Sequence, residues 1–427
     1  VPKLNRRPSL EHRRMTAMIR ILHTADWHVG QTLRGFSREH EHRKVFEQLE
    51  EIVVERNVDA LIIAGDVFDS QNPSGEAQQL FYNTLVRLSR AQPRMTTVIV
   101  AGNHDAAGRL EAPRPLLEAF NIRVVGNVRR HDGRVEAARH LVPIADASGA
   151  VAAHVLAVSY PTAACLPNLT RLDGESGSPV IAGVRSLYAE LLDTLRGQID
   201  GLPLVLTGHL HVAGGIESEG AERRILVGGQ HAVPHDVFPT EASYVALGHL
   251  HKAQAIGRDT VRYSGSLIPL SATEQPYEHG VTLVSLDGAQ VASDHIPVNR
   301  PVPFLRLPEA GDMRLSELGD HLTALNLPSD LITHERPFLQ VRLSRDGLPS
   351  GFREEIDRIA ENFPVRVVDA RVAAIPGALN REALTDPLIR LAERDPEDLF
   401  KLAFERAFGV APDAAHLDVF NQARAEA

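Results

Sequence analysis

The sequence lacks several features that would place it in a specialised class of proteins. Cys165 is the only cysteine, so no intrachain disulfide can form, and a reducing cytoplasm fits this usage. No uninterrupted apolar run reaches about 18 residues, so we expect no transmembrane helix. The basic segment 1–17 is not followed by an apolar stretch of the signal-peptide kind, and we expect it to be a flexible N-terminal extension.

Positive charge is also scarce. The formal net charge is −10, whereas a chain that binds DNA tightly by itself is usually basic. Carboxylates that bind metal ions are neutralised locally, and phosphate contacts need only a local basic surface. The charge therefore argues against tight DNA binding by this chain alone, without excluding DNA as a substrate.

The remaining composition describes an ordinary globular protein. Apolar residues make up 43% of the 427 residues and charged residues 23%, and this length predicts two or three domains. Apolar runs rich in Val, Ile and Leu alternate with helix-like segments, as in sheets that are buried on both faces. The expected strands are Ile19–His23, Ala60–Ala64, Thr97–Ala101, Ile122–Val125, Ala153–Val158 and Pro203–Thr207. The expected helices are Arg38–Arg56, Glu76–Arg90, Arg109–Phe120 and Val184–Ile199.

Short strand-like runs without long helices between them follow, and they predict a second sheet packed on the first. They are Arg224–Val227, Tyr244–Leu247, Val261–Tyr263 and Val281–Leu286. We therefore expect an α/β fold, a two-sheet sandwich flanked by helices, over residues 18–297. A Pro-rich linker, 297–303, then leads to a small α+β domain over 304–378 and a helical tail over 381–427. The runs that suggest this domain are Phe304–Leu307, Glu317–Ala324, Phe338–Leu343, Phe352–Asn362 and Val365–Ala374.

Five short polar motifs carry the chemistry, and four of them directly follow an apolar run. They are Asp26-Trp27-His28, Gly65-Asp66-Val67-Phe68-Asp69, Gly102-Asn103-His104-Asp105, Gly208-His209 and Gly248-His249-Leu250-His251. Ligands bind at the carboxyl edge of strands in open α/β sheets, so these side chains are expected to meet there. A single Asp-x-His or Gly-His is common by chance and Gly-Asn-His-Asp is more specific, but all five motifs in this order are strong evidence.

The residue types in these motifs suit a pair of divalent metal ions. Carboxylate, imidazole and amide-oxygen ligands without thiolates favour Mn²⁺, Fe²⁺ or Zn²⁺ and disfavour a structural zinc site. Asp66 is placed to bridge two ions, which together would activate a water for in-line attack on a phosphate ester. His104 need not bind metal, because it can protonate the leaving oxygen instead.

The motifs resemble the calcineurin-like metallophosphoesterase superfamily over roughly residues 18–297. Within that superfamily the chain resembles the SbcD family of bacterial nucleases. The closer likeness rests on His23–Gly30, Tyr244–Lys252, Tyr263–Ser266 and the tail segment Asp395–Phe400, so it covers nearly the whole chain.

This resemblance implies a fold, a site and partners. The fold would be a two-sheet metallophosphoesterase sandwich with a DNA-capping α+β domain and a tail that binds the ATPase partner. One metal would be held by Asp26, His28, Asp66 and His251, and the other by Asp66, Asn103, His209 and His249. His104 would act as general acid or transition-state stabiliser. The family cuts duplex ends, hairpins and single strands of DNA, usually with Mn²⁺. It does so as a homodimer in a heterotetramer with SbcC, an SMC-like ATPase, in double-strand-break processing, recombination and repair.

Other polar residues near the motifs have two interpretations each. Asp69 and Asp105 would either orient a metal-bound histidine or cap the turn that follows them. His211 repeats the His-x-His spacing with His209, but a surface role is the simpler interpretation. His231 and His235 lie in a Pro-containing loop, where they either have no specific role or line a DNA groove.

Two surfaces of the chain also have two interpretations each. Arg34, Arg38, Arg109 and Arg114 follow the first and third motifs and are candidates for phosphate contacts, although solvated helix faces are the default for such charges. The tail carries an apolar stripe that either packs on its own domain or docks on a partner helix. Its candidate partner-binding residues are Leu399, Phe400, Phe404, Phe408, Leu417 and Phe420.

The favoured function is a metal-dependent DNA phosphodiesterase, and two alternatives compete with it. A phosphatase or cyclic-nucleotide phosphodiesterase of the same superfamily would not need the domain and the Phe-rich tail after Pro303. A scaffold that tethers DNA ends would not need every candidate ligand and His104 to be present.

Overall fold

The computed structural model describes most of the chain, and all structural statements below refer to that part. The described residues are 18–166, 178–199, 201–218, 232–349, 351–373, 396–408, 412, 416–417, 419–421 and 424. The expected extension 1–17, the expected strand Arg224–Val227 and His231 lie outside them.

The described chain forms two compact units, and each is a body of its own. The first comprises Val1–Leu305, Leu327–Gln340 and Phe363–Asp369, and the second comprises Arg306–Asn326, Val341–Asn362 and Ala370–Ala427. All five polar motifs lie in the first unit.

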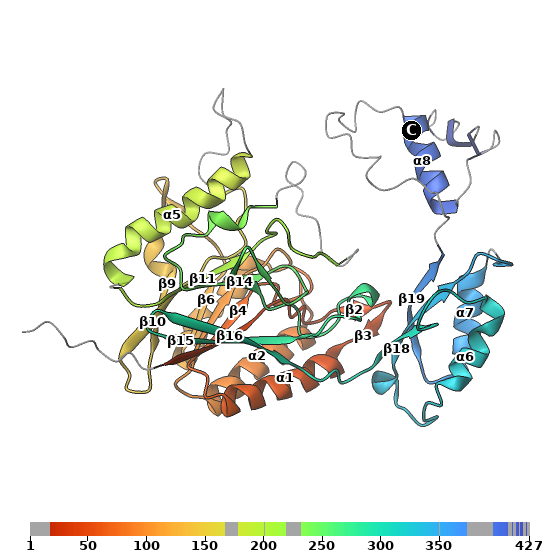
Figure 1. Cartoon of the computed structure of the whole chain (residues 1–427), viewed down its shortest axis with the longest axis horizontal. Coiled ribbons are helices and arrows are strands. Elements are labelled where there is room, and N and C mark those ends of the chain that lie inside the picture. Colours follow the sequence, from red (N-terminus) through yellow and green to blue (C-terminus); the bar gives the residue numbers. More distant parts are fainter. Residues whose placement is uncertain are drawn as a thin grey trace, which may run out of the picture. The chain divides into compact units, whose positions relative to one another are not determined.

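A six-stranded sheet opens the first unit (Figure 1). Its order is β16-β15-β1-β4-β5-β6, and its central strands β1, β4, β5 and β6 are parallel. The strands are β1 (Ile19–Thr24), β4 (Ala60–Ala64), β5 (Thr96–Val100), β6 (Ile122–Val125), β15 (Gly280–Asp287) and β16 (Gln290–Pro297). The expected strand Val281–Leu286 is real, but it pairs antiparallel with β1 and so belongs to the first sheet, not to the second.

A second six-stranded sheet has the order β13-β14-β12-β11-β10-β9. Here β10, β11, β12 and β14 are parallel, while β9 and β13 run antiparallel at the two edges. The strands are β9 (Leu141–Ala145), β10 (Val151–Leu156), β11 (Leu204–His209), β12 (Tyr244–Gly248), β13 (Gln254–Ile256) and β14 (Arg258–Tyr263).

The two sheets pack face to face, with helices on their outer faces. In β4, Ala60 and Ile62 belong to the core between the sheets, whereas Leu61 and Ile63 belong to the core beneath the helices. This alternation follows from the two-residue period of a strand, and it explains why β4 is apolar throughout. The helices are α1 (Glu39–Glu55) and α2 (Gly75–Ala91), side by side below the first sheet, and α5 (Pro179–Ile199) against the second (Figure 1). The expected two-sheet sandwich flanked by helices is confirmed.

One expected helix is broken into pieces. Instead of a continuous helix over Arg109–Phe120, the chain forms α3 (Ala107–Glu111), α4 (Arg114–Leu117) and a 3-10 turn, Glu118–Phe120. Pro113 stands at the break as the N-cap of α4, and a proline cannot donate the backbone hydrogen bond that would continue α3.

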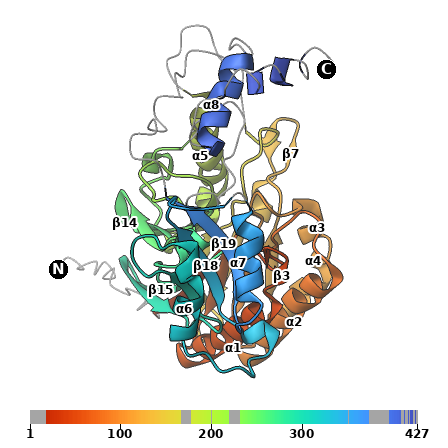
Figure 2. The same cartoon turned by 90° about the vertical axis from the view of Figure 1, so that its right-hand side faces the viewer.

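Beyond the sandwich, a third sheet has the order β17-β18-β19. Its strands are β17 (Phe304–Leu307), β18 (Phe338–Leu343) and β19 (Arg366–Val372), close to the expected runs. In the second unit, α6 (Leu318–Ala324) and α7 (Phe352–Ala360) lie side by side (Figure 2), and α8 spans Pro396–Phe408. The short strands are β2 (Thr32–Leu33), β3 (Phe36–Ser37), β7 (Arg130–His131) and β8 (Arg134–Val135). Within the described ranges no helix has the length and apolarity that a bilayer crossing needs.

Candidate metal centre

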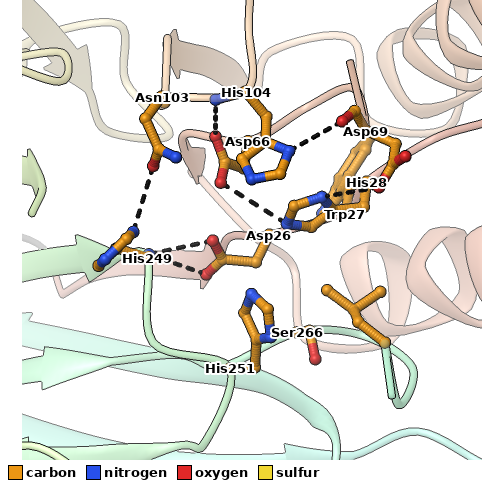
Figure 3. A network of polar contacts seen from close by, with 12 residues as sticks. Asp26, Trp27, His28, Asp66, Asp69, Asn103, His104, His249, His251 and Ser266 are labelled. Atoms are coloured by element: carbon orange, nitrogen blue, oxygen red, sulfur yellow. Dashed lines mark hydrogen bonds and ion pairs between the residues drawn. The ribbon is translucent and has the colours of Figure 1, made fainter. Parts of the chain in front are cut away.

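The strand ends of both sheets bring the five motifs to one place. Asp26, Asp66 and Asn103 follow β1, β4 and β5, which are adjacent parallel strands. His209 ends β11 and His249 follows β12, which are neighbours in the second sheet. The side chains converge between the sheets (Figure 3).

The backbone around these residues is bent in an unusual way. Asp26, His28, Asp66 and His249 all have positive φ angles of 53°, 46°, 49° and 107°. Left-handed conformations of such residues cost on the order of 1–3 kcal/mol each and cluster at functional sites. The bends are held by hydrogen bonds from Asp26 N to Gly65 O (3.0 Å) and from His28 N to Asp66 O (3.0 Å).

Glycines are required at two places where the backbone comes close to a candidate ligand side chain. A Cβ at Gly65 would lie 2.2 Å from Nδ1 of His209, and one at Gly102 would lie 2.1 Å from Oδ1 of Asp66. Both distances are far inside van der Waals contact. The small residues of the motifs therefore allow the ligand side chains to come together.

A first cluster, which we name the Asp26 cluster, consists of Asp26, His28 and His251. All three are buried, and each offers a ligand atom within 4.8 Å of the others. Both carboxylate oxygens of Asp26 accept the backbone N–H of His249, at 3.0 and 3.1 Å. Asp26 is thereby fixed by the strand end of the opposite sheet.

A second cluster, which we name the His209 cluster, consists of Asp66, His209 and His249, with Asn103 beside it. Nε2 of His209 lies 3.3 Å from Oδ2 of Asp66 and 3.0 Å from Oδ1 of Asn103. Nδ1 of His249 lies 3.2 Å from the same oxygen of Asn103. Oδ2 of Asp66 is also 3.6 Å from Nε2 of His28, so this carboxylate stands between the two clusters.

Burial and mutual charge set the protonation of the metal-free clusters. Burial raises the pKa of Asp26. Burial would also raise the pKa of Asp66, but the charge of His209 and its hydrogen bond outweigh this and lower it. Burial would lower the pKa of His209, yet the carboxylate of Asp66 raises it to about 9. Burial keeps the pKa of His249 well below its usual value, so that ring is neutral and ready to bind metal.

The donors fit a pair of divalent ions. His28 is 3% exposed, and neither of its ring nitrogens makes a hydrogen bond with proper geometry, although Asp66 and Asp69 oxygens lie within ion-pair distance. A buried imidazole without hydrogen bonds is costly unless another partner satisfies it. Carboxylate, imidazole and amide oxygen together suit Mn²⁺, Fe²⁺ or Zn²⁺, and Asp66 can contribute to both clusters.

His104 lies beside the Asp26 cluster, where its ring offers a nitrogen within 4.8 Å of a ring nitrogen of His28 and a carboxylate oxygen of Asp69. Its Nδ1 is 2.8 Å from the backbone oxygen of Asp69, and its backbone N–H donates to Oδ1 of Asp66 at 2.8 Å. An acceptor at Nδ1 keeps a proton on that nitrogen, so Nε2 is the nitrogen that can exchange a proton with a substrate. The ring centroid is 4.7 Å from that of His28 (Figure 3).

Asp69 and Asp105 make different contacts at the site. Oδ1 of Asp69 lies 3.3 Å from Nδ1 of His28, where it can orient that ring. Asp105 instead accepts backbone N–H groups of Val67 (3.1 Å), Phe68 (2.9 Å) and Gly102 (2.9 Å), so it holds the loop after β4. Burial, followed by the charge of Asp66, raises the pKa of Asp105 to about 6.

The structure contradicts one of the candidate DNA contacts. Arg38 is 1% exposed, and its guanidinium donates to Glu41 (2.8 Å), to Gln31 (2.9 Å) and to the carbonyl of Pro269. These partners occupy it inside the protein, so it does not face a phosphate.

The other three arginines are accessible to solvent. Arg34 is exposed in the turn between β2 and β3, and Arg109 is exposed while donating to the Asn72 side chain. Arg114 pairs with Glu118 at 2.7 Å.

The other candidate residues are His211, His235 and the apolar residues of the tail. His211 pairs with Glu217 at 3.2 Å, with its ring centroid 6.3 Å from that of His249. His235 lies in a 3-10 turn, His235–Val237. In the tail, Phe400 stacks on Phe420 at 4.4 Å and lies 5.7 Å from Phe404, so part of the apolar stripe packs on itself. Leu399 and Leu417 are half-buried, and the side chain of Phe408 lies outside the described residues.

Two residues near the clusters carry no sequence signal. Glu274 is fully buried and contacts His251, although it lies 23 residues away in a short polar segment. Tyr160 follows β10, where its N–H donates to Ala101 O at 2.8 Å and the Asp66 charge contributes to its raised pKa, after burial. Neither is part of a recognisable motif, because only the folded chain brings them to the site.

Comparison with known proteins agrees with this geometry. The calcineurin-like phosphoesterase family matches residues 19–213, and the family described as type 5 capsule protein repressor C-terminal domain matches 300–408. The SbcD component of the SbcCD nuclease from Rhodobacter capsulatus is 46% identical over 90% of this chain and 94% of its own length. Its counterpart in Escherichia coli K12 is 30% identical over 95% of this chain and 96% of its own. A solved structure of GAP50, the anchor in the inner membrane complex of Plasmodium, has a TM-score of 0.35 over 66% of this chain and 84% of its own at 10% identity, too low to support an argument.

Proposed function

This chain belongs to the SbcD family of calcineurin-like metallophosphoesterases, and we propose that it is a metal-dependent DNA nuclease. The observation that carries the proposal is the position of Asp66. Its Oδ2 lies 3.3 Å from His209 and 3.6 Å from His28, so one carboxylate serves both clusters. That arrangement is typical of sites that hold two ions for in-line hydrolysis of a phosphodiester.

The ligands divide between the two clusters. Asp26, His28, Asp66 and His251 would hold one ion, and Asp66, Asn103, His209 and His249 the other. Bound together, two divalent ions supply an acidified water and neutralise the charge that develops on the phosphate. The mixture of ligands supports Mn²⁺ among the ions of this class.

His104 supplies the proton that the leaving oxygen needs. The carbonyl of Asp69 holds its Nδ1–H, which orients the ring and leaves proton transfer to Nε2. As the bond between phosphorus and the leaving oxygen breaks, Nε2–H of the imidazolium passes its proton to that oxygen. Asp105 supports the same site by holding the loop that carries Asp66 to Asp69.

Substrate and partners complete the proposal. The substrates are duplex ends, hairpins and single strands of DNA, and the setting is double-strand-break repair and recombination in the cytoplasm, at the nucleoid. A homodimer would assemble with an SbcC-type SMC-like ATPase in a heterotetramer. The α+β domain over 304–378 would cap the DNA, with Arg34, Arg109 and Arg114 as phosphate contacts of the first unit.

The tail over 381–427 would bind the ATPase. Its apolar residues Leu399, Phe400, Phe404, Phe408, Leu417 and Phe420 provide the docking surface. Leu399 and Leu417 are only half-buried, which leaves part of this apolar surface accessible to a partner helix. A chain that ends at Pro387 should lose co-purification with the ATPase and still cut small substrates with Mn²⁺. Unchanged co-purification would reject the docking site.

The nuclease itself is tested with the purified full-length chain. End-labelled linear duplex and hairpin DNA are incubated with Mn²⁺, with Mg²⁺ or with EDTA, with and without the ATPase partner and ATP. We expect cutting that depends on Mn²⁺ and stops with EDTA. If no condition gives cutting, the proposal fails in favour of a DNA-tethering scaffold or a phosphatase of another substrate.

A further inference from the structure

A buried glutamate lies directly behind one of the candidate metal ligands. Glu274 ends a short 3-10 turn, Ala272–Glu274, in the loop between β14 and β15, and its side chain is fully buried. Its Oε1 lies 2.9 Å from Nδ1 of His251. The nitrogen of His251 that remains for the Asp26 cluster is therefore Nε2.

A carboxylate in such a place needs compensation. Burial of a charge without partners is strongly unfavourable, so buried carboxylates are paired or hydrogen-bonded. Here Oε2 accepts the backbone N–H of Leu270 at 2.8 Å, and the Ser271 hydroxyl donates to Oε1 at 3.4 Å. The loop closes on the carboxylate and leaves Oε1 facing His251.

The loop is in turn held in place from several sides. Gln31 donates to the carbonyl of Leu270 at 3.1 Å, and Arg38 donates to the carbonyl of Pro269. His279 approaches the carbonyl of Glu274 at 3.2 Å, and its other ring nitrogen lies 3.1 Å from the Ser266 hydroxyl. These contacts explain what the buried Arg38 does, since it fixes the segment that carries Glu274.

We propose that Glu274 is the positioning residue for His251, setting its tautomer and ring orientation and strengthening its bond to the metal of the Asp26 cluster. The inference rests on the proposed metal-dependent function and adds a residue that the five motifs do not contain. A carboxylate that accepts the far N–H of a ligating imidazole raises the basicity of the ring. Loss of such a partner typically lowers metal affinity by roughly 10- to 100-fold.

The alternative is that Glu274 only closes the loop. The structure argues against this, because Oε1 lies 2.9 Å from Nδ1 of His251 and 3.4 Å from the Ser271 hydroxyl, so its shorter contact is with the candidate metal ligand and not with the loop. A purely structural glutamate would affect both clusters equally when replaced, through general loss of stability. A positioning glutamate affects the Asp26 cluster first.

The experiment measures Mn²⁺ binding without DNA, so it does not depend on nuclease activity. Wild type, Glu274→Gln and Glu274→Ala are titrated with Mn²⁺ and followed by electron paramagnetic resonance, which reports the number of bound ions and their magnetic coupling. Glu278→Gln is the matched control, because Glu278 is exposed in the same loop. Thermal unfolding of the metal-free proteins confirms that each variant is folded.

We expect Glu274→Ala to bind one ion with nearly wild-type affinity and the other roughly 10- to 100-fold more weakly, with loss of the coupled signal. Glu274→Gln should lose less, because an amide oxygen still accepts the N–H of His251 but carries no charge; it also serves if Glu274→Ala does not fold. Excess Mn²⁺ should restore the coupled signal in both.

Two ions bound with wild-type affinity in a folded Glu274→Ala or Glu274→Gln would overturn the inference, and so would equal weakening of both ions. The result is separable from the proposed function. A wild type that binds two coupled ions but cuts no DNA would reject the nuclease and leave the role of Glu274 standing.

Discussion

The Asp26 cluster and the His209 cluster contain similar ligands but differ in what lies behind their histidines. In the Asp26 cluster, His251 faces the carboxylate of Glu274 at 2.9 Å and His28 faces that of Asp69 at 3.3 Å. In the His209 cluster, Nδ1 of His209 faces the neutral carbonyl of Ala64 at 2.8 Å. An imidazole whose far N–H faces an anion donates its lone pair to a metal ion more strongly than an imidazole whose far N–H faces a neutral carbonyl.

This difference teaches that two sites built from the same residue types need not be equivalent. The Asp26 cluster has negative charge behind its ligands and should hold its ion more tightly. In the metal-free state the imidazole of His209 is protonated at neutral pH, because Asp66 raises its pKa to about 9. The ion of the His209 cluster must displace that proton, which lowers the apparent affinity near neutral pH.

The largest effect is expected where the two clusters meet. Asp66→Ala should remove both ions and lower cleavage by at least about 10³-fold, since several kcal/mol of charge stabilisation depend on the metals. Elemental analysis counts the bound Mn²⁺, and Asp294→Ala, on the exposed side of β16, is the control. Two ions still bound to Asp66→Ala would show that the clusters do not share this carboxylate.

Next in size is the loss of the residue that belongs to neither cluster. His104→Gln should lower the rate of cleavage by roughly 10²- to 10⁴-fold, the usual contribution of a general acid, while both ions stay bound. His131→Gln is the matched control, because His131 is 83% exposed. Cleavage close to wild type by His104→Gln would reject its role in proton transfer.

A smaller effect should separate the two clusters. Asp69→Asn removes the charge behind His28 but keeps the backbone carbonyl that holds His104. We expect roughly tenfold weaker binding or less at the Asp26 cluster, because this side chain is 37% exposed and its charge is partly screened. Mn²⁺ titration beside the exposed variant Asp132→Asn measures it. If only the ion of the His209 cluster bound more weakly, the charge of Asp69 would not be what distinguishes the Asp26 cluster.

The smallest expected effect is the release of a proton from His209 when metal binds. Below about pH 9 His209 is protonated in the metal-free protein, so filling its cluster should release about one proton. The apparent affinity of the weaker ion should then rise as the pH rises, by up to about tenfold per unit until the proton is gone. Calorimetry in two buffers with different ionisation enthalpies measures the release. An affinity independent of pH between 7 and 9 would contradict the raised pKa.

Much of the fold followed from local pattern. The strand Ala60–Ala64 and the strand Phe338–Leu343 coincide with their apolar runs, and α1 differs from its expected range by one residue at each end. The pairing of strands was harder to predict, because the sequence of Val281–Leu286 predicts a strand without indicating which strand lies next to it. Its partnership with β1 depends on how the whole chain returns to the first sheet.

The surroundings of individual side chains could not be predicted from the local sequence pattern either. Arg38 has the sequence context of a solvent-facing helix start, yet the Pro269 loop and Glu41 enclose it. Glu274 has no neighbouring motif, and its role depends on a contact with His251 across the loop. The contacts of Arg38 with Pro269 and of Glu274 with His251 join residues far apart in the chain, so neither periodicity nor spacing predicts them.

The sequence by itself determined the alternation of strands and helices, the residues able to bind metal, and their order along the chain, because these are properties of short segments. The tertiary structure decided which strand ends meet, that Asp66 stands between two clusters, and which oxygen lies behind each histidine. The physical reason is that a metal site is defined over a few ångströms. Only the folded chain brings those atoms within that range, with Gly65 leaving room for His209 of the second sheet and Gly102 leaving room for Asp66 of the first.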